Sequence, residues 1–286
     1  MSDKRRTTSQ AQTDLGTYYD RLGLWTTLMR PFGYGGGSAQ LTVHRLLADP
    51  LAGGRPTATR LHDLIVSRLP VHERPRMLDA GCGLGGTMLD LTERWGGSAV
   101  GLTLSQTQRD SALRAAAARG LAQRVDARVQ SYDHPPAGPF DVIVAIESLA
   151  HSVSPWTSVA ALARVLAPGG FFVIVDDMPE PAALGSSTLQ AFREGWRAPV
   201  VWGRRQYLEA FGAERLALVT DDDLTGESRL RTLAQIGRME RLNRVARTLA
   251  PARWRVVLDS YYGGLALERM YREGLMRYRM LIARRS

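Results

Sequence analysis

A glycine-rich loop set between a strand and a helix constrains the fold of this chain more than any other feature. Residues 77–86 read MLDAGCGLGG, in which an apolar pair leads into Asp79 and then into four glycines. Apolar periodicity resumes at once over 87–91, which predicts a helix. Strand, glycine loop and helix in this order build the nucleotide crevice of an open α/β sheet, because glycine lets a ligand approach the backbone closely. A G-x-G motif alone also occurs in dinucleotide-binding folds, so it does not identify the ligand. The segments that follow along the chain are needed to distinguish among these folds.

Strands and helices alternate along the middle of the chain. Strands are predicted at 76–79, 98–102, 127–130, 140–146 and 171–175, and helices between them at 87–95, 105–119 and 155–166. The run FDVIVAI at 140–146 is continuously apolar, as a central strand covered on both faces requires. The alternation predicts a doubly wound, mostly parallel α/β sheet.

Composition and periodicity divide the chain into four parts. Residues 1–16 are polar and are expected to form a disordered tail, whereas 17–70 show interrupted helical periodicity and are expected to form a helical cap. Residues 71–178 contain the alternating core. Residues 179–286 are expected to supply helices on the acceptor side and the last strands of the sheet. Within this last part we predict a mobile insertion at 179–199, helices at 204–211, 230–249 and 253–274, and strands at 215–219 and 278–283.

Composition also narrows the classes of function. The formal charge of +9 is typical of proteins that bind nucleic acid. However, Lys4 is the only lysine, and the arginines are scattered without a basic block. We therefore expect no nucleic acid and a small-molecule substrate, with homo-oligomerisation left open. No apolar run approaches a membrane span and the N-terminus lacks a secretory signal, so a cytoplasmic location is expected. The one cysteine, Cys82, excludes an intramolecular disulfide and is expected to be a small packing residue rather than a catalytic thiol.

Four segments from 76 to 177 together carry a family resemblance. They are MLDAGCGLGG, GLTLSQTQ at 101–108, PFDVIVAIESLAH at 139–151 and VLAPGGFFVIVDD at 165–177. At this spacing the chain resembles the class I S-adenosylmethionine-dependent methyltransferases. The resemblance implies a seven-stranded Rossmann-like sheet whose last strand is antiparallel, and S-adenosylmethionine as cofactor.

The resemblance assigns cofactor contacts to the matching positions. Gly81 and Gly83 would accommodate the methionine part of the cofactor, and Asp79 would hold its ammonium group. The alternative for Asp79 is a plain loop carboxylate. At the end of the second strand, where many members carry an acid for the ribose, this chain has Thr103 and Leu104, followed by Gln108.

The pattern G-L-T-L-S-x-x-Q resembles the cyclopropane fatty acid synthase branch, in which threonine and glutamine bind the ribose; otherwise Gln108 is a surface residue of a helix. Ser131 and Tyr132 fall where the family contacts adenine, and Ile146 precedes the acceptor motif. Tyr132 is alternatively a core aromatic. Tyr34, in a glycine-rich turn, would place its ring against the sulfonium or else anchor the cap.

The segment AIESLAH at 145–151 bears on the methyl acceptor. In cyclopropane synthases an acid that binds bicarbonate directly precedes the histidine, but here that position is Ala150. The arrangement of Glu147 and His151 instead resembles sterol and geranyl diphosphate C-methyltransferases, which methylate a carbon–carbon double bond. The resemblance makes Glu147 the candidate base and His151 its partner. Otherwise Glu147 caps a loop and His151 is structural.

Alkene methylation also calls for aromatic walls and, with a diphosphate, for cations. The candidate substrate residues are Tyr18, Tyr19, Trp196, Arg204, Tyr207 and Tyr261. Core packing is the alternative for the aromatics and a solvated surface for Arg204. No protein-held metal is predicted: Asp221–Asp223 are expected in a solvated loop, and Mg²⁺ would enter with the diphosphate.

The sequence therefore predicts an alkene C-methyltransferase acting on a short prenyl diphosphate of isopentenyl or geranyl type. An O- or N-methyltransferase of a small natural product is the alternative enzyme. A non-enzymatic binder that kept the fold is the alternative of another class.

Overall fold

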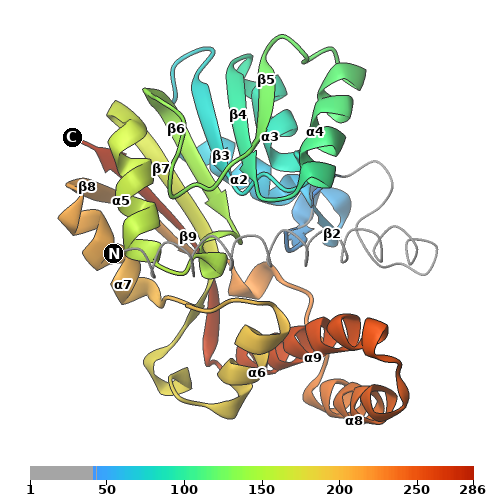
Figure 1. Ribbon diagram of the computed structural model, residues 1–286. Helices are drawn as coiled ribbons and strands as arrows, with labels where there is room; N and C mark the ends of the chain where they lie inside the picture. The colour runs from blue at the N-terminus through green and yellow to red at the C-terminus, as the bar shows by residue number, and fades with distance from the viewer. Residues whose placement is uncertain (1–40, 43) are drawn as a thin grey trace, which may run out of the picture.

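A mixed sheet of seven strands organises the chain (Figure 1). The structure, a computed structural model, describes residues 41, 42 and 44–286. The expectations for 1–16 and for most of the cap lie outside the described residues, and so do Tyr18, Tyr19 and Tyr34. The strands are β3 (Arg76–Ala80), β4 (Ser98–Thr103), β5 (Val125–Val129), β6 (Phe140–Ile146), β7 (Leu166–Pro179), β8 (Leu216–Asp223) and β9 (Met276–Arg285).

The strand order is β5-β4-β3-β6-β7-β9-β8. Neighbours from β5 to β7 are parallel, whereas β9 runs antiparallel to both β7 and β8. This confirms the seven-stranded arrangement with an antiparallel last strand that the family resemblance implies. The order reverses between β3 and β6, which is the point where open α/β sheets bind ligands.

Helices cover both faces of the sheet, because successive side chains of each strand point to opposite faces. Met77 and Val144 belong to one buried cluster, and their neighbours Leu78 and Ala145 belong to another. The first cluster includes side chains of α2 (Thr59–Arg68), α3 (Gly86–Trp95), α4 (Gln106–Ala118), α6 (Ser187–Gly195) and α9 (Ala252–Arg272). The second includes side chains of α5 (Pro155–Val165) and α7 (Arg204–Ala213).

The described end of the cap contains a small hairpin as well as a helix. Strands β1 (Leu47–Asp49) and β2 (Arg55–Thr57) pair antiparallel and flank the short 3₁₀ turn η2 (Pro50–Ala52). The expected helical periodicity corresponds to α2, whose buried face includes Leu61, Leu64 and Ile65.

Two expectations for the last part of the chain are wrong. Residues 179–199 are not a mobile insertion, since after the short turn η4 (Pro181–Ala183) they form α6, which packs on α9 and buries Phe192. Asp221–Asp223 do not form a loop; they continue β8, paired with β9, and Arg279 and Arg204 both bind Asp221.

Another helix, α8 (Leu233–Leu249), lies beside α9 at the bottom of Figure 1. A further short turn, η5 (Thr225–Glu227), follows β8.

The crossing of α6 and α9 depends on two glycines and gives a stability prediction. A Cβ at Gly195 would stand 2.5 Å from the Asp259 carbonyl oxygen and 2.8 Å from Gly263 Cα. Gly195→Ala should therefore lower the free energy of unfolding by about 1–3 kcal/mol, because backbone must move apart. Gly212→Ala is the matched control: it has open space in α7 and should gain up to about 1 kcal/mol. Urea unfolding measures both, and equal effects would contradict the close crossing.

Candidate active site

The glycine loop lies at the carboxyl end of β3 and is held against the neighbouring strands. The N–H groups of Gly81 and Cys82 donate to the Leu102 carbonyl at 3.1 and 2.8 Å. Gly81 has φ = 116°, and a Cβ there would stand 2.5 Å from Ser148 Cβ. The loop after β3 and the loop after β6 therefore touch, and only glycine fits at their contact.

Asp79 near the end of β3 is a buried carboxylate, and one of its oxygens lacks a partner among the described residues. Its side chain is 3% exposed, and Oδ2 has no hydrogen-bond partner in the described part of the chain. Burial raises the pKa of Asp79 to about 7. A buried carboxylate of this kind needs a cation or a donor. The ammonium group of S-adenosylmethionine would supply both, so the residues present fit this cofactor.

Cys82 packs behind the loop. A Cβ at Gly101 of β4 would stand 2.7 Å from Cys82 Sγ, so the thiol fills the space that this glycine leaves. Burial raises the pKa of the thiol well above its ordinary value, with the charge of Asp79 as a second cause. A protonated, enclosed thiol is a packing group and not a nucleophile.

The residues predicted for the ribose side lie together on the turn from β4 into α4. The Thr103 hydroxyl donates to Gln108 Oε1 at 2.6 Å, and Ser105 caps α4 by accepting from the Gln108 N–H at 3.1 Å. Leu104 lies between them and is half-buried. The arrangement orients the Gln108 amide at the carboxyl edge of the sheet; its contact with ribose stays a prediction.

The residues predicted for adenine follow β5. The Tyr132 hydroxyl donates to the Ser148 carbonyl at 3.0 Å, which ties this loop to the residue that faces Gly81. Ser131 Oγ accepts from the Asp133 N–H at 3.1 Å. Ile146 is the last residue of β6 and is half-buried. The structure thus brings the predicted positions to one edge, and their binding roles stay predictions.

Glu147 directly follows Ile146 and has an unusual backbone. Its φ of 49° lies in the left-handed region, which costs a residue with a side chain roughly 1–2 kcal/mol. The Glu147 N–H donates to the Val175 carbonyl at 2.8 Å. Glu147 Oε1 accepts two hydrogen bonds of 2.8 Å, from the Tyr278 hydroxyl and from the Arg45 backbone N–H. These contacts hold the carboxylate in place, and strain of this kind gathers at functional sites.

Two more carboxyl groups lie at the end of β7, beside Glu147. Asp176 accepts from the Tyr207 hydroxyl at 3.0 Å, and Asp177 accepts from the Tyr271 hydroxyl. Burial raises the pKa of Asp176 to about 8 and that of Asp177 to about 6. For Asp177 the nearby Arg45 guanidinium opposes the rise. The edge therefore carries a cluster of acids, tyrosines and one arginine.

Five residues of this cluster were not among the site residues predicted from the sequence: Arg45, Asp176, Asp177, Tyr271 and Tyr278. A signal existed for the two aspartates, because they end the apolar run FFVIVDD at the edge where Asp79 and Glu147 also lie. Arg45 and the tyrosines carried no local signal.

The structure separates the other predicted acceptor-side residues. His151, in the short turn η3 (Leu149–His151), has Nδ1 3.2 Å from the Arg197 carbonyl, and burial lowers its pKa. Tyr207 lies in the acid cluster through Asp176. Trp196 donates to the Ser260 carbonyl at 3.1 Å, which matches the alternative of helix packing.

Two further candidates lie away from these contacts. The Tyr261 hydroxyl lies 3.6 Å from Met239 Sδ, between α8 and α9. Arg204 pairs with Asp221 on β8, the outermost strand of the sheet. Their substrate roles stay predictions.

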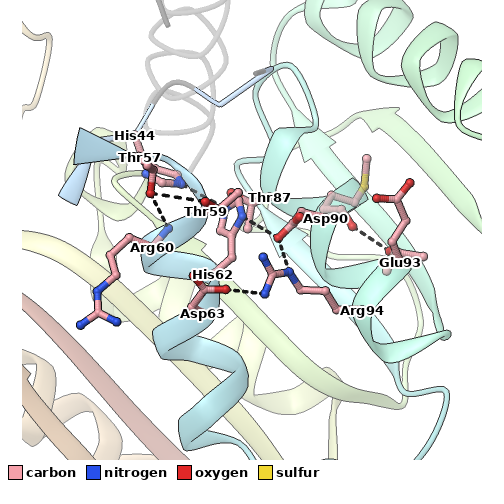
Figure 2. A network of polar contacts seen from close by, with 12 residues as sticks. His44, Thr57, Thr59, Arg60, His62, Asp63, Thr87, Asp90, Glu93 and Arg94 are labelled. Carbon is pink, nitrogen blue, oxygen red and sulfur yellow. Dashed lines mark hydrogen bonds and ion pairs between the residues drawn. The ribbon is translucent and has the colours of Figure 1, made fainter. Parts of the chain in front are cut away.

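A second polar network lies on the α3 side of the loop (Figure 2). His44 Nε2 is 3.1 Å from His62 Nε2, and His62 Nδ1 is 2.8 Å from Asp90 Oδ2. His62 Nε2 also lies 3.1 Å from the hydroxyl of Thr87, near the start of α3. Arg94 extends the network by binding Asp90 at 2.7 Å. The network joins the segment before β1 to the helix that follows the glycine loop.

Comparison with known proteins agrees with this geometry. Residues 78–174 match the family model described as "Methyltransferase domain". Ajmaline N-methyltransferase of Rauvolfia serpentina is 29% identical over 197 residues, which cover 65% of this chain and 65% of the relative. The chain thus spans just under two thirds of that relative's length.

Two solved structures resemble nearly the whole chain. Geranyl diphosphate methyltransferase in complex with GPP and sinefungin has a TM-score of 0.73 at 24% identity, covering 97% of this chain and 100% of the other. Geranyl diphosphate C-methyltransferase from Streptomyces coelicolor A3(2), in complex with Mg²⁺, geranyl diphosphate and S-adenosyl-L-homocysteine, has a TM-score of 0.71 at 21% identity, covering 96% and 98%.

Residues 78–174 therefore match a methyltransferase domain, and the fold and the glycine loop agree with those of the class I S-adenosylmethionine-dependent methyltransferases. Its fold is similar to those of the two geranyl diphosphate methyltransferases. In the described part of the chain, none of the helices combines the length and apolar character that crossing a membrane requires.

The unpartnered Asp79 predicts pH-dependent cofactor binding. The free protein holds a proton on Asp79 below its pKa of about 7, whereas the cofactor's ammonium group requires the carboxylate. Binding of S-adenosyl-L-homocysteine should therefore be roughly tenfold weaker at pH 6 than at pH 8. Asp79→Asn should bind weakly with little pH dependence, and surface Asp126→Asn should behave as wild type. Calorimetry at three pH values measures this, and a flat wild-type profile would contradict it.

His44 predicts a second pH effect, on stability. Burial, and then the charge of His62, lower the pKa of His44 from 6.5 to about 4. As the pH falls from 6.5 towards 4, His44 becomes protonated in the unfolded chain but stays neutral in the folded chain. Protonation therefore favours the unfolded chain, and the free energy of unfolding falls. The difference in unfolding free energy between wild type and His44→Gln should therefore shrink by about 3 kcal/mol over this range. Urea titrations measure it; exposed His134→Gln should show no such trend.

Proposed function

We propose that the chain methylates a carbon–carbon double bond, and that its acceptor is a short prenyl diphosphate of isopentenyl or geranyl type. The observation that carries the proposal is Glu147, whose backbone is strained and whose carboxylate is fixed by Tyr278 and by the Arg45 N–H. Its neighbour Ser148 touches Gly81 of the loop that would hold the donor. The likeness of the fold to two geranyl diphosphate methyltransferases supports this choice of acceptor.

The proposed chemistry needs a base and no nucleophile from the protein. When bound, S-adenosylmethionine supplies an electrophilic methyl group. The π electrons of the acceptor form the new carbon–carbon bond as the sulfur–methyl bond breaks, which leaves a carbocation on the acceptor. Glu147 then takes a proton from an adjacent carbon, whose C–H electrons form the new double bond. The cluster around Glu147 holds the carboxylate so that it is already oriented when the cation forms.

Mg²⁺ is proposed to enter with the diphosphate. Across the described residues, no group of three or more histidine, cysteine, aspartate or glutamate side chains is arranged to hold a metal ion. Diphosphate oxygens and water would then provide most of the magnesium ligands, as is common for this cation. One of the two similar structures contains Mg²⁺ with geranyl diphosphate, which supports this arrangement.

The second candidate is O- or N-methylation of a small natural product. The N-methyltransferase relative favours it. An amine or phenol attacks the methyl group directly once it is oriented, so proximity supplies most of the catalysis. Such a reaction would not require a base at the position of Glu147 when the acceptor is already deprotonated.

An acceptor panel separates the candidates. The protein is incubated with methyl-labelled cofactor and with isopentenyl, dimethylallyl or geranyl diphosphate, a sterol, a phenol or an amine, with and without Mg²⁺. We expect label in a prenyl diphosphate and a dependence on Mg²⁺. Label confined to the phenol or amine would establish the second candidate instead.

The role of Glu147 has its own test. Glu147→Gln should lower kcat on the prenyl diphosphate by about 10²–10⁴, because proton removal loses its base. The affinity for S-adenosyl-L-homocysteine should stay within about twofold, since Glu147 lies on the acceptor side. Glu93→Gln, on the exposed face of α3, is the matched control and should keep wild-type kcat. Unchanged turnover in Glu147→Gln would remove its assignment as base.

A further inference from the structure

We propose that Arg45 is a positioning residue, which assembles the acceptor-side carboxylates when the segment before β1 is seated on the sheet by His44. The proposal rests on the proposed function in one respect, since it takes Glu147 as the base. Its structural part concerns contacts of Arg45 that hold whatever the acceptor is.

Arg45 reaches the carboxylates in two ways. Its backbone N–H donates to Glu147 Oε1 at 2.8 Å, and its guanidinium lies 3.8 Å from Asp177 Oδ1. The side chain is 16% exposed, so the attraction is only weakly screened by water. One residue from outside the sheet thus contacts both Glu147, directly after β6, and Asp177, near the carboxyl end of β7.

The guanidinium also orders the tyrosines that hold these acids. It lies 4.7 Å from the ring centre of Tyr271 and 5.5 Å from that of Tyr278, within the range of cation–π attraction. Tyr271 donates to Asp177 and Tyr278 donates to Glu147. Each tyrosine therefore contacts the cation through its ring and one carboxylate through its hydroxyl. Loss of the guanidinium would weaken both hydrogen bonds and leave buried negative charge unpaired.

His44, the residue before Arg45, attaches the segment before β1 to a different part of the site. Through His62 it is linked to Asp90 and Thr87 of α3, the helix that follows the glycine loop (Figure 2). Two consecutive residues therefore bind two different parts of the site. One is the helix behind the cofactor loop, and the other is the pair formed by Glu147, directly after β6, and Asp177, near the end of β7. This geometry makes the conformation of Glu147 depend on a segment some 100 residues earlier in the chain.

The first experiment does not require an acceptor. We measure the thermal midpoint of the full chain from pH 5.5 to 8 for wild type, Arg45→Met and Arg45→Lys. The groups that face Arg45 are Glu147, Asp177, Tyr271 and Tyr278, with Asp176 and Tyr207 behind Asp177. Without the cation the pKa of Asp177 should rise above its value of about 6, so stability is lost more steeply as the pH rises and the buried acids ionise.

Arg45→Lys, which keeps the charge, should restore most of the wild-type pH dependence. The matched control is Arg68→Met, which removes a half-exposed guanidinium paired with Asp222 and should lower the midpoint equally at all these pH values. Parallel curves for wild type and Arg45→Met would overturn the proposal.

The second experiment uses whichever acceptor the panel identifies. Arg45→Met should lower kcat by about tenfold or more and move the acid limb of the pH–rate profile up by about one pH unit. The dissociation constant of S-adenosyl-L-homocysteine should stay within about twofold. Arg45→Lys should recover the profile, which a loss of packing alone would not allow.

The outcomes distinguish the two proposals. If Arg45→Met changes the pH dependence of stability but no prenyl diphosphate is methylated, the proposed function fails and the positioning role stands. If prenyl diphosphates are methylated and Arg45→Met keeps the wild-type kcat and pH profile, the positioning role fails alone.

Discussion

The close contact between the loops after β3 and β6 is the constraint on which the site depends. Gly81 and Ser148 approach so closely that a Cβ on the glycine would overlap the serine. Asp79 of β3 precedes Gly81, and Glu147, directly after β6, precedes Ser148. Because the two strands are adjacent and parallel, their carboxyl ends deliver the proposed donor site and the proposed base to one place.

Burial shapes the electrostatics of this edge more than any pair of charges does. The pKa values of Asp79, Asp176 and Asp177 are all raised, and desolvation is the largest cause in each case. The compensation differs among them. Asp176 has a tyrosine hydroxyl, Asp177 has a tyrosine and Arg45, and Asp79 has an oxygen without a partner among the described residues. The one acid left without compensation is the one that the family resemblance assigns to a cationic ligand.

Much of the fold was predictable because its signals are local. The apolar run at 140–146 gave a central strand, and the glycine loop gave the strand–loop–helix unit that follows β3. The acid cluster was less accessible to prediction, because Arg45 and Tyr278 meet Glu147 across 102 and 131 residues of chain. No periodicity records such a contact. The helix α6 was not predicted either, because its segment contains proline and glycine and lacks a clear local helix signal. It is stabilised by packing on α9, where Gly195 lies against Gly263.

The charge balance of the acid cluster bears on which acceptor this edge of the sheet can hold. Near neutral pH, Asp176 with a pKa of about 8 is mostly protonated, whereas Asp177 with a pKa of about 6 is mostly ionised. The carboxyl groups of Glu147, Asp176 and Asp177 thus gather beside one guanidinium, that of Arg45. Such a cluster of acids suits a transient carbocation and opposes a diphosphate in the same place. In the proposed reaction the diphosphate must therefore point away from Glu147, with its charge offset by Mg²⁺. In the proposed reaction these acids would lie beside the carbocation, whereas methylation of a heteroatom forms no carbocation.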